Sequence, residues 1–234
     1  MKPVIDYNIY LVTDTVYFKD DSIYNKLEAA LSAGVTLLQY RDKSAETRIL
    51  YARALKVKAL CDKYRVPLII NDRADIAFAV QAAGVHLGQD DLPPLIARRM
   101  LGSDAVIGVS AHNADEALKA EADTADYLGC GAVYATATKK DTSVIGTEGL
   151  SKISAATKLP FVGIGGITLE NYKAVLQAGA GGAAIVSAIL GADDICRTVR
   201  KLKNMALEAK SVKTLTKQHS QRQNLKFKNF VTLY

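Results

Sequence analysis

The sequence contains no apolar run long enough to cross a membrane. Its hydrophobic stretches are much shorter than the roughly 18 to 20 residues that a transmembrane helix needs. The N-terminal stretch MKPVIDYNIYLVTD also has neither the apolar segment nor the small-residue cleavage site of a secretory signal. We therefore expect a cytoplasmic protein that has no membrane partner.

Cysteine is equally scarce, with three residues in the chain: Cys61, Cys130 and Cys196. The number is odd and no CxxC spacing occurs, so the sequence predicts neither a disulfide framework nor a zinc site. The composition is otherwise ordinary for a globular protein, with 49% hydrophobic and 23% charged residues. A chain of 234 residues with this composition can build one large domain with a substantial core.

The excess of positive charge lies almost entirely at the C-terminal end. The net charge is +6, and residues 205–234 carry +5 of it, from six Lys or Arg residues against one Glu. We therefore predict a nearly neutral domain over residues 1–204, with the end of the last helix and a short basic tail over 205–234. The basic residues of the tail are spaced rather than clustered, and no recognition motif accompanies them. We expect a solvated tail and no nucleic-acid partner.

Short apolar runs alternate with amphipathic stretches along the chain. Eight runs are expected to be strands: 8–13, 35–40, 66–71, 84–88, 105–110, 126–131, 160–165 and 182–187. They lack the strict alternation of half-exposed strands, as expected for parallel strands covered on both faces. Helices are expected at 21–33, 44–64, 74–82, 91–101, 113–122, 147–157, 169–178 and 193–209. The pattern predicts an α/β fold, a single (β/α)8 TIM barrel; a doubly wound open sheet is the structural alternative.

The expected helix over 44–64 shows the clearest helical periodicity, with apolar residues at spacings of three and four. Ser44 together with Thr47 offers a start for it. We expect its buried face to carry Ile49, Ala52, Leu55 or Lys56, Ala59 and Leu60.

Polar side chains gather where the expected strands end. In a TIM barrel the active site lies at the C-terminal ends of the strands, and the loops after strands seven and eight often bind a phosphate. The second strand ends in QYRDK, which places Gln39, Arg41 and Lys43 on one side of an extended segment. Other strands end in Asn71, Asp72, Asp91, Ser110 and Ser187, and the seventh runs into the glycines of GIGGIT.

The charges at these strand ends are of both signs. Arg41, Lys43 and Lys139 suit a multiply charged anion, whereas Asp72 and Asp91 would repel one. A hard cation removes this conflict, because magnesium binds carboxylates together with phosphate oxygens and water. The sequence therefore predicts a diphosphate held by magnesium and cations, beside a second phosphate held by glycine loops.

With these motifs the chain resembles the thiamine phosphate synthase family. The resemblance covers about residues 10–190 and rests on YLVTD, QYRDK, IINDR, GVHLGQDD, IGVSAH, YATATKKD, VGIGGI and IVSAI in this order. It implies a transferase of thiamine biosynthesis that couples 4-amino-2-methyl-5-(diphosphooxymethyl)pyrimidine with 4-methyl-5-(2-phosphoethyl)thiazole to give thiamine phosphate and pyrophosphate. It also implies a dissociative mechanism, in which the bond to pyrophosphate breaks before the thiazole nitrogen attacks.

The resemblance assigns a role to each matching residue. The expected contacts to the pyrimidine diphosphate are Gln39, Tyr40, Arg41, Asp42, Lys43, Asn71, Ser110 and Lys139, and the expected catalytic residues among them are Arg41, Lys43, Ser110 and Lys139. The expected contacts to the thiazole phosphate are Thr136, Ala137, Thr138, Gly166, Val186 and Ser187. Asp72 and Asp91 are the expected magnesium ligands. The chain departs from the family at Ala132 and Ala135, where prolines are usual, and at Gly181, where aspartate is common.

Several of these residues have a purely structural alternative. Asp72 and Asp91 could cap the helices that follow them, and Ser110 could cap the fifth helix. The alternatives for the remaining residues are a simple turn at Gly165 and Gly166, a core position with satisfied hydrogen bonds for His86, a solvated position for Lys140, and no role for His112.

Two other functions remain open from the residues alone. One is a thiazole tautomerase on the same barrel, which would not need the five charged residues Arg41, Lys43, Asp72, Asp91 and Lys139 together. The other is a non-catalytic protein that binds RNA through the tail, which would leave the polar strand ends unexplained. The partners that we expect are therefore small-molecule substrates, and the oligomeric state is left open, a homo-oligomer included.

Overall fold

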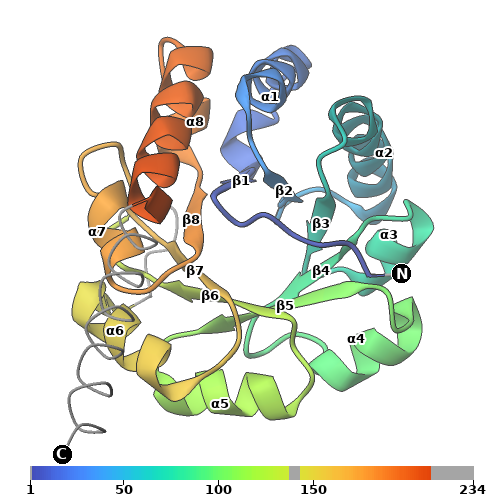
Figure 1. The fold of residues 1–234 in the computed structure, drawn as a ribbon. Helices are drawn as coiled ribbons and strands as arrows, with labels where there is room; N and C mark the ends of the chain where they lie inside the picture. The colour runs from blue at the N-terminus through green and yellow to red at the C-terminus, as the bar shows by residue number, and fades with distance from the viewer. Residues whose placement is uncertain (1, 137–142, 212–234) are drawn as a thin grey trace, which may run out of the picture.

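The computed structural model describes residues 2–136 and 143–211. Its centre is a closed barrel of parallel strands, in which each strand pairs with its neighbour in sequence and β1 pairs with β8 (Figure 1). The strands are β1 (Ile9–Val12), β2 (Leu37–Tyr40), β3 (Leu68–Asn71), β4 (Gly84–Leu87), β5 (Val106–Ala111), β6 (Tyr127–Gly131), β7 (Phe161–Ile164) and β8 (Gly182–Ile185). The expected TIM barrel is confirmed, and each expected strand overlaps an observed one.

Helices surround the barrel and cover the outer face of the strands (Figure 1). They are α1 (Ser22–Ala33), α2 (Thr47–Tyr64), α3 (Ala74–Ala79), α4 (Pro94–Leu101), α5 (Ala114–Ala122), α6 (Gly146–Ala156), α7 (Tyr172–Gln177) and α8 (Ser187–Leu190), with a short 3-10 helix at Thr15–Tyr17. Residues 195–211 are also helical, close to the last helix expected over 193–209. None of the described helices combines the length and the apolar composition that a membrane span requires.

Apolar side chains form two layers separated by the strands. The larger cluster lies between the strands and the helices, and includes Leu11 and Leu38. The smaller cluster fills the barrel interior with Tyr10, Val12, Leu37, Ile69, Val106, Tyr127, Val162 and Ala184. Because successive side chains of a strand point to opposite faces, this register decides which residues reach the barrel axis and which face the helices.

The expected buried face of α2 is wrong. The buried residues are Leu50, Ala54, Val57 and Cys61, whereas Ile49 and Leu55 are 47% and 43% exposed. Both sets have spacings of three and four, so periodicity alone does not distinguish them. The observed face packs on the barrel because Leu50, Ala54, Val57 and Cys61 belong to the same apolar cluster as the outward residues of β2.

Candidate active site

A pocket opens at the C-terminal ends of the strands, where the topology of a TIM barrel places active sites. Its lining includes eleven of the residues expected in the site, which are Gln39, Arg41, Lys43, Asn71, Asp72, Asp91, Ser110, Thr136, Gly166, Val186 and Ser187. Ala137, Thr138 and Lys139 lie outside the described residues, as does Lys140, for which a solvated position was expected. The structure therefore brings together side chains that are separated by about 150 positions in the sequence.

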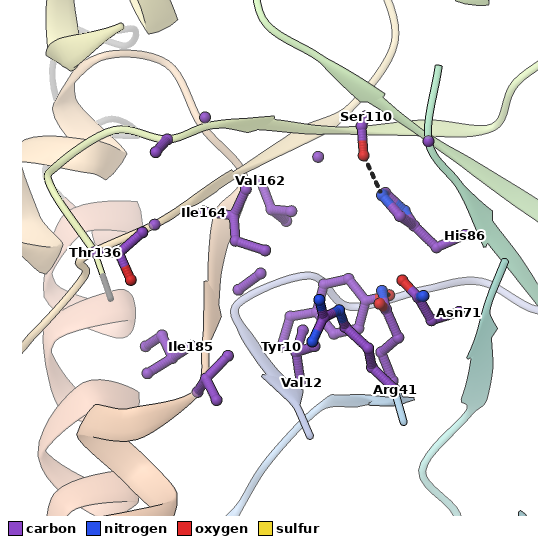
Figure 2. A pocket seen from close by; sticks show the side chains of 18 of the residues that line it. Tyr10, Val12, Arg41, Asn71, His86, Ser110, Thr136, Val162, Ile164 and Ile185 are labelled. Carbon is purple, nitrogen blue, oxygen red and sulfur yellow. Dashed lines mark hydrogen bonds between the residues drawn. The ribbon is translucent and has the colours of Figure 1, made fainter. Parts of the chain in front are cut away.

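The two sides of the pocket differ in chemistry (Figure 2). Arg41, Asn71, His86 and Ser110 lie on the side built by β2 to β5. The apolar side chains that belong to β7 and β8, among them Val162, Ile164 and Ile185, lie on the other side with Thr136. One pocket therefore offers charged and polar groups to one part of a ligand and apolar contact to another.

The segment after β2 sends alternate side chains into the pocket. Gln39, Arg41 and Lys43 line it, whereas Tyr40 and Asp42 do not. Tyr40 packs edge-on against Phe18 in the layer below the helices, with ring centroids 5.3 Å apart. The expectation that the side chains of Tyr40 and Asp42 reach the substrate therefore lacks support, because the period of two in an extended chain turns them away from the barrel axis.

Asp42 instead organises the loop that carries Arg41 and Lys43. Its carboxylate has no exposed area and accepts hydrogen bonds from Arg53 Nη1 at 2.6 Å and from Thr15 Oγ1 at 3.1 Å. Burial alone would raise the pKa of Asp42, but the hydrogen bonds from Arg53, the Ser44 backbone and Thr15 outweigh it and the pKa is lowered. The charged form of Asp42 therefore holds this loop against α2 and the short helix after β1.

Arg41 has a partner that the sequence reasoning missed. Its Nη1 atom lies 2.5 Å from Oδ2 of Asp14, and the two side chains are only 17% and 13% exposed. Thr13 strengthens the same junction, because its hydroxyl accepts from the Arg41 backbone N–H at 2.8 Å and donates to the Arg41 carbonyl oxygen at 3.0 Å. Asp14 is the last residue of the YLVTD motif, and its position after β1 is the signal that could have identified it.

Two carboxylates lie next to each other on the polar side of the pocket. Burial and the neighbouring Asp72 carboxyl raise the pKa of Asp91, against the opposing influence of the Gly88 N–H and Lys43. Asp91 Oδ2 accepts from the Gly88 backbone N–H at 2.6 Å, and Asp72 pairs with the ammonium group of Lys43. Asp72 has a φ of 61°, which a residue other than glycine rarely adopts.

The capping alternatives for these carboxylates are wrong. Helix α3 begins after Arg73 and α4 begins after Pro93, and neither helix has a side-chain cap. Ser110 does not cap a helix either, since the cap of α5 is Asn113, whose side chain accepts from the Glu116 N–H.

The carboxylate pair fits magnesium bound together with a ligand. Within residues 2–136 and 143–211, no group of three or more His, Cys, Asp or Glu side chains could hold a metal ion, so protein side chains alone do not form a complete site there. Magnesium commonly takes one or two carboxylates and fills its other positions with phosphate oxygens and water. Asp72 and Asp91 supply that number, and a divalent cation between them would relieve the repulsion that contributes to the raised pKa of Asp91.

Ser110 and His86 form the wall next to this pair. His86 Nε2 lies 3.1 Å from Ser110 Oγ (Figure 2), and His86 Nδ1 lies 3.0 Å from the hydroxyl of Tyr127. The expectation of a core histidine with satisfied hydrogen bonds is confirmed, since His86 is 8% exposed. His86 also lines the pocket, which its place inside an apolar strand did not indicate.

His112 lines the pocket as well, although no role was expected for it. Its Nδ1 atom lies 2.8 Å from Glu116 Oε2, and its backbone N–H donates to the same oxygen at 2.9 Å. Burial alone would raise the pKa of Glu116, but the hydrogen bonds from His112 outweigh burial and the pKa is lowered. The i, i+4 spacing of His112 and Glu116 could have indicated this pair.

The apolar side of the pocket includes two positions where close contacts leave room for glycine alone. Gly165 and Gly166 have φ values of 98° and 63°. A methyl group on Gly166 would lie 2.6 Å from the Ala135 carbonyl oxygen, and one on Gly165 would lie 2.7 Å from the Ala132 Cβ. Asn171 Nδ2 donates to the Gly166 carbonyl oxygen at 2.9 Å and holds the turn in place. The two glycines therefore form a turn and also line the pocket.

Comparison with known proteins identifies the family. A sequence model described as thiamine monophosphate synthase matches residues 9–189. The thiamine-phosphate synthase of Clostridium acetobutylicum is 48% identical over 82% of this chain and 90% of that protein. The corresponding enzyme of Clostridium beijerinckii is 47% identical over 87% of this chain and 98% of that protein.

A solved structure agrees with the sequence comparisons. The thiamine phosphate pyrophosphorylase from Pyrococcus furiosus superposes with a TM-score of 0.79 at 37% identity, covering 87% of this chain and 97% of that one. The chain therefore belongs to the thiamine monophosphate synthase family, the enzymes of thiamine biosynthesis that form thiamine phosphate.

Proposed function

We propose that the pocket couples 4-amino-2-methyl-5-(diphosphooxymethyl)pyrimidine with 4-methyl-5-(2-phosphoethyl)thiazole and releases pyrophosphate, with magnesium as the cofactor. The observation that carries the proposal is the pair Asp72 and Asp91, next to Lys43, on the polar side of a pocket whose other side is apolar. Carboxylates and a cation are the groups that a metal-bound diphosphate needs. The apolar side, with Gly166 and Ser187, suits a thiazole ring and its phosphate.

Each group has a distinct task in this proposal. Arg41, Lys43 and Ser110 bind the diphosphate, and Asp72 and Asp91 hold the metal. Magnesium, when bound, neutralises charge that develops on the departing pyrophosphate. Lys139, which lies outside the described residues, is proposed as a further cation on the diphosphate, and Ala137 and Thr138, which also lie outside them, as contacts of the thiazole phosphate.

The chemical step is a substitution at the methylene carbon of the pyrimidine. The C–O bond to the diphosphate breaks, both electrons leave with pyrophosphate, and the pyrimidine methyl cation is stabilised by its 4-amino group. The thiazole nitrogen then donates its lone pair to that carbon and forms the C–N bond. This chemistry requires electrostatic stabilisation and alignment rather than a nucleophilic side chain. Preorganised donors such as Arg41 and Lys43 stabilise the charge of the departing pyrophosphate.

The test is a mass measurement on the purified chain with magnesium. Both substrates together are expected to yield thiamine phosphate and pyrophosphate in equal amounts, and either substrate alone is expected to yield neither. If no product formed while the thiazole phosphate still bound, the result would favour a thiazole tautomerase over the synthase.

We also propose that the protein works in the cytoplasm. Cys61, Cys130 and Cys196 are all free, and burial raises the pKa of Cys61 and Cys130 to about 12, so these two thiols stay protonated. Three unpaired cysteines suit a reducing compartment. Cell fractionation followed by immunodetection would test this placement, and recovery in a secreted fraction would contradict it.

A further inference from the structure

A row of hydrogen-bonded polar groups crosses the barrel interior at the base of the pocket, and every member of the row except Tyr127 lines the pocket. Gln39 Nε2 lies 2.6 Å from the Tyr10 hydroxyl, and that hydroxyl lies 2.7 Å from the hydroxyl of Tyr127. The Tyr127 hydroxyl lies 3.0 Å from His86 Nδ1, and His86 Nε2 lies 3.1 Å from Ser110 Oγ. The row therefore links two pocket residues, Gln39 on β2 and Ser110 on β5, through groups that the proposed chemistry does not use.

The middle of the row is sealed from water. Tyr10 and Tyr127 are 1% and 0% exposed. Burial is the main reason why the pKa of each tyrosine is raised, so both hydroxyls keep their protons at neutral pH. Glycine provides the necessary space, because a methyl group on Gly108 would lie 2.4 Å from the Tyr127 hydroxyl and one on Gly129 would lie 2.9 Å from His86 Cε1.

Donor counting gives the row a direction. The amide N–H of Gln39 donates to Tyr10, whose only other polar neighbour among the described residues is the Tyr127 hydroxyl. A buried hydroxyl has to donate its hydrogen, so Tyr10 donates to Tyr127 and Tyr127 donates to His86 Nδ1. The proton of a neutral His86 is then on Nε2, where it points to Ser110 Oγ.

We propose that Tyr127 is a positioning residue of the reaction, which holds His86 with its proton on Nε2 and thereby directs the Ser110 hydroxyl hydrogen into the pocket. Because Ser110 Oγ accepts from His86, its own hydrogen remains for a ligand. Phosphate oxygens accept hydrogen bonds and cannot donate them when ionised, so this direction suits the departing pyrophosphate. At the other end, the Gln39 carbonyl oxygen remains an acceptor for the 4-amino group, whose positive character increases as the pyrimidine cation forms.

This inference rests on the proposed function for the roles of Ser110 and Gln39, but its physical core can be measured separately. The first measurement is the tautomer of His86 by nitrogen NMR on histidine-labelled protein, with the signals assigned by their loss in His86→Gln. The wild type is expected to carry the proton on Nε2. Tyr127→Phe removes the hydroxyl that enforces this state, so a mixture of tautomers is expected.

Tyr7→Phe is the matched control. The ring of Tyr7 packs on that of Tyr127 with centroids 5.0 Å apart, yet its hydroxyl is not part of the row. This variant is expected to retain the wild-type tautomer. A thermal unfolding scan of both variants separates loss of the fold from loss of the hydrogen bond. Tyr10→Phe is a second variant that tests the same hydrogen-bond direction. It removes the donor that orients the Tyr127 hydroxyl, so a mixture of His86 tautomers is again expected.

Kinetics provide the second measurement. Tyr127→Phe is expected to lower kcat about tenfold while the KM of both substrates changes by less than about threefold, because the Ser110 bond strengthens as charge develops on the leaving group. Tyr7→Phe is expected to match the wild type. A wild-type proton on Nδ1, or equal kcat values in the two variants, would overturn the inference. If the wild type proved inactive, the proposed function would fail while the tautomer measurement still decided this inference.

Discussion

The substitution Asp42→Asn distinguishes two roles for a residue that the family resemblance assigned to the substrate. The carboxylate of Asp42 has no exposed area and bonds Arg53 at 2.6 Å, and it lies outside the pocket lining. An asparagine has nearly the same size but no charge, so it keeps the packing and removes the ion pair. If Asp42 is an organiser of its loop, the main effect will be on stability.

The expected loss of stability is about 2 to 3 kcal/mol. A hydrogen bond to a charged group contributes about 1.5 to 3 kcal/mol, and breaking a fully buried ion pair costs about 3 to 5 kcal/mol. The lower part of this range applies because Arg53 is 29% exposed and water can partly solvate it once its partner is neutral. For a chain of this size, the melting temperature should fall by about 4 to 12 °C.

The effect should also depend on pH. The pKa of Asp42 is lowered in the folded protein, so its contribution to stability is present above the ordinary aspartate value of about 3.9. That contribution disappears as the pH falls through the folded value, because the folded state must then bind a proton. The difference between wild type and Asp42→Asn should therefore be full at pH 7 and shrink below about pH 4.

The assay combines thermal unfolding with steady-state kinetics. Asp62→Asn is the matched control, since Asp62 is 62% exposed and its pair with Lys58 lies on the surface of α2. It should change the melting temperature little. Asp42→Asn should also raise the KM of the pyrimidine diphosphate, because the loop that carries Arg41 and Lys43 loosens. An unchanged melting temperature with a raised KM would refute the loop role and favour a direct contact with the substrate.

Three further variants test other parts of the site. Asp91→Asn should lose magnesium-dependent turnover while the fold survives, and unchanged rates at limiting magnesium would contradict its role as a metal ligand. Thr138→Val combined with Ser187→Ala should raise the KM of the thiazole phosphate more than that of the pyrimidine diphosphate, and an equal rise in both would contradict the proposed division of the pocket. Gly129→Ala should push against the His86 ring and destabilise the fold by about 1 to 3 kcal/mol, so a melting temperature equal to that of the wild type would refute this tight packing.

The fold could be predicted from the sequence because its signals are local. Strands covered on both faces appear in the sequence as continuous apolar runs. Eight such runs that alternate with amphipathic helical segments are typical of a closed barrel. When a helix carries two apolar stripes, tertiary packing determines which of them faces the core. On α2 the stripe with Ile49 and Leu55 looked as suitable as the one with Leu50 and Val57, and only contact with the barrel decides between them.

Some residues of the pocket could likewise be predicted from a local sequence pattern, and others could not. Gln39, Arg41 and Lys43 could be predicted because the period of two along an extended chain is visible in the sequence. The same period turns the side chains of Tyr40 and Asp42 away from the pocket, although the resemblance had included both residues.

Other features depend on contacts between side chains that lie on different strands or just after them. The contact between Asp14 and Arg41 and the row through Tyr10 and Tyr127 join residues from different strands. Sequence spacing has no information on which side chains meet across the barrel interior, so these contacts required the structure.

The metal dependence of thiamine phosphate formation tests the proposed reaction and its magnesium site most directly. The purified chain would be given both substrates with magnesium, then with a chelator, and then with magnesium restored, and the product would be followed by mass. We expect product with magnesium, none with the chelator and recovery when magnesium is restored. Equal product in the presence of the chelator would contradict the role of Asp72 and Asp91, and no product under any condition would contradict the proposed synthesis itself.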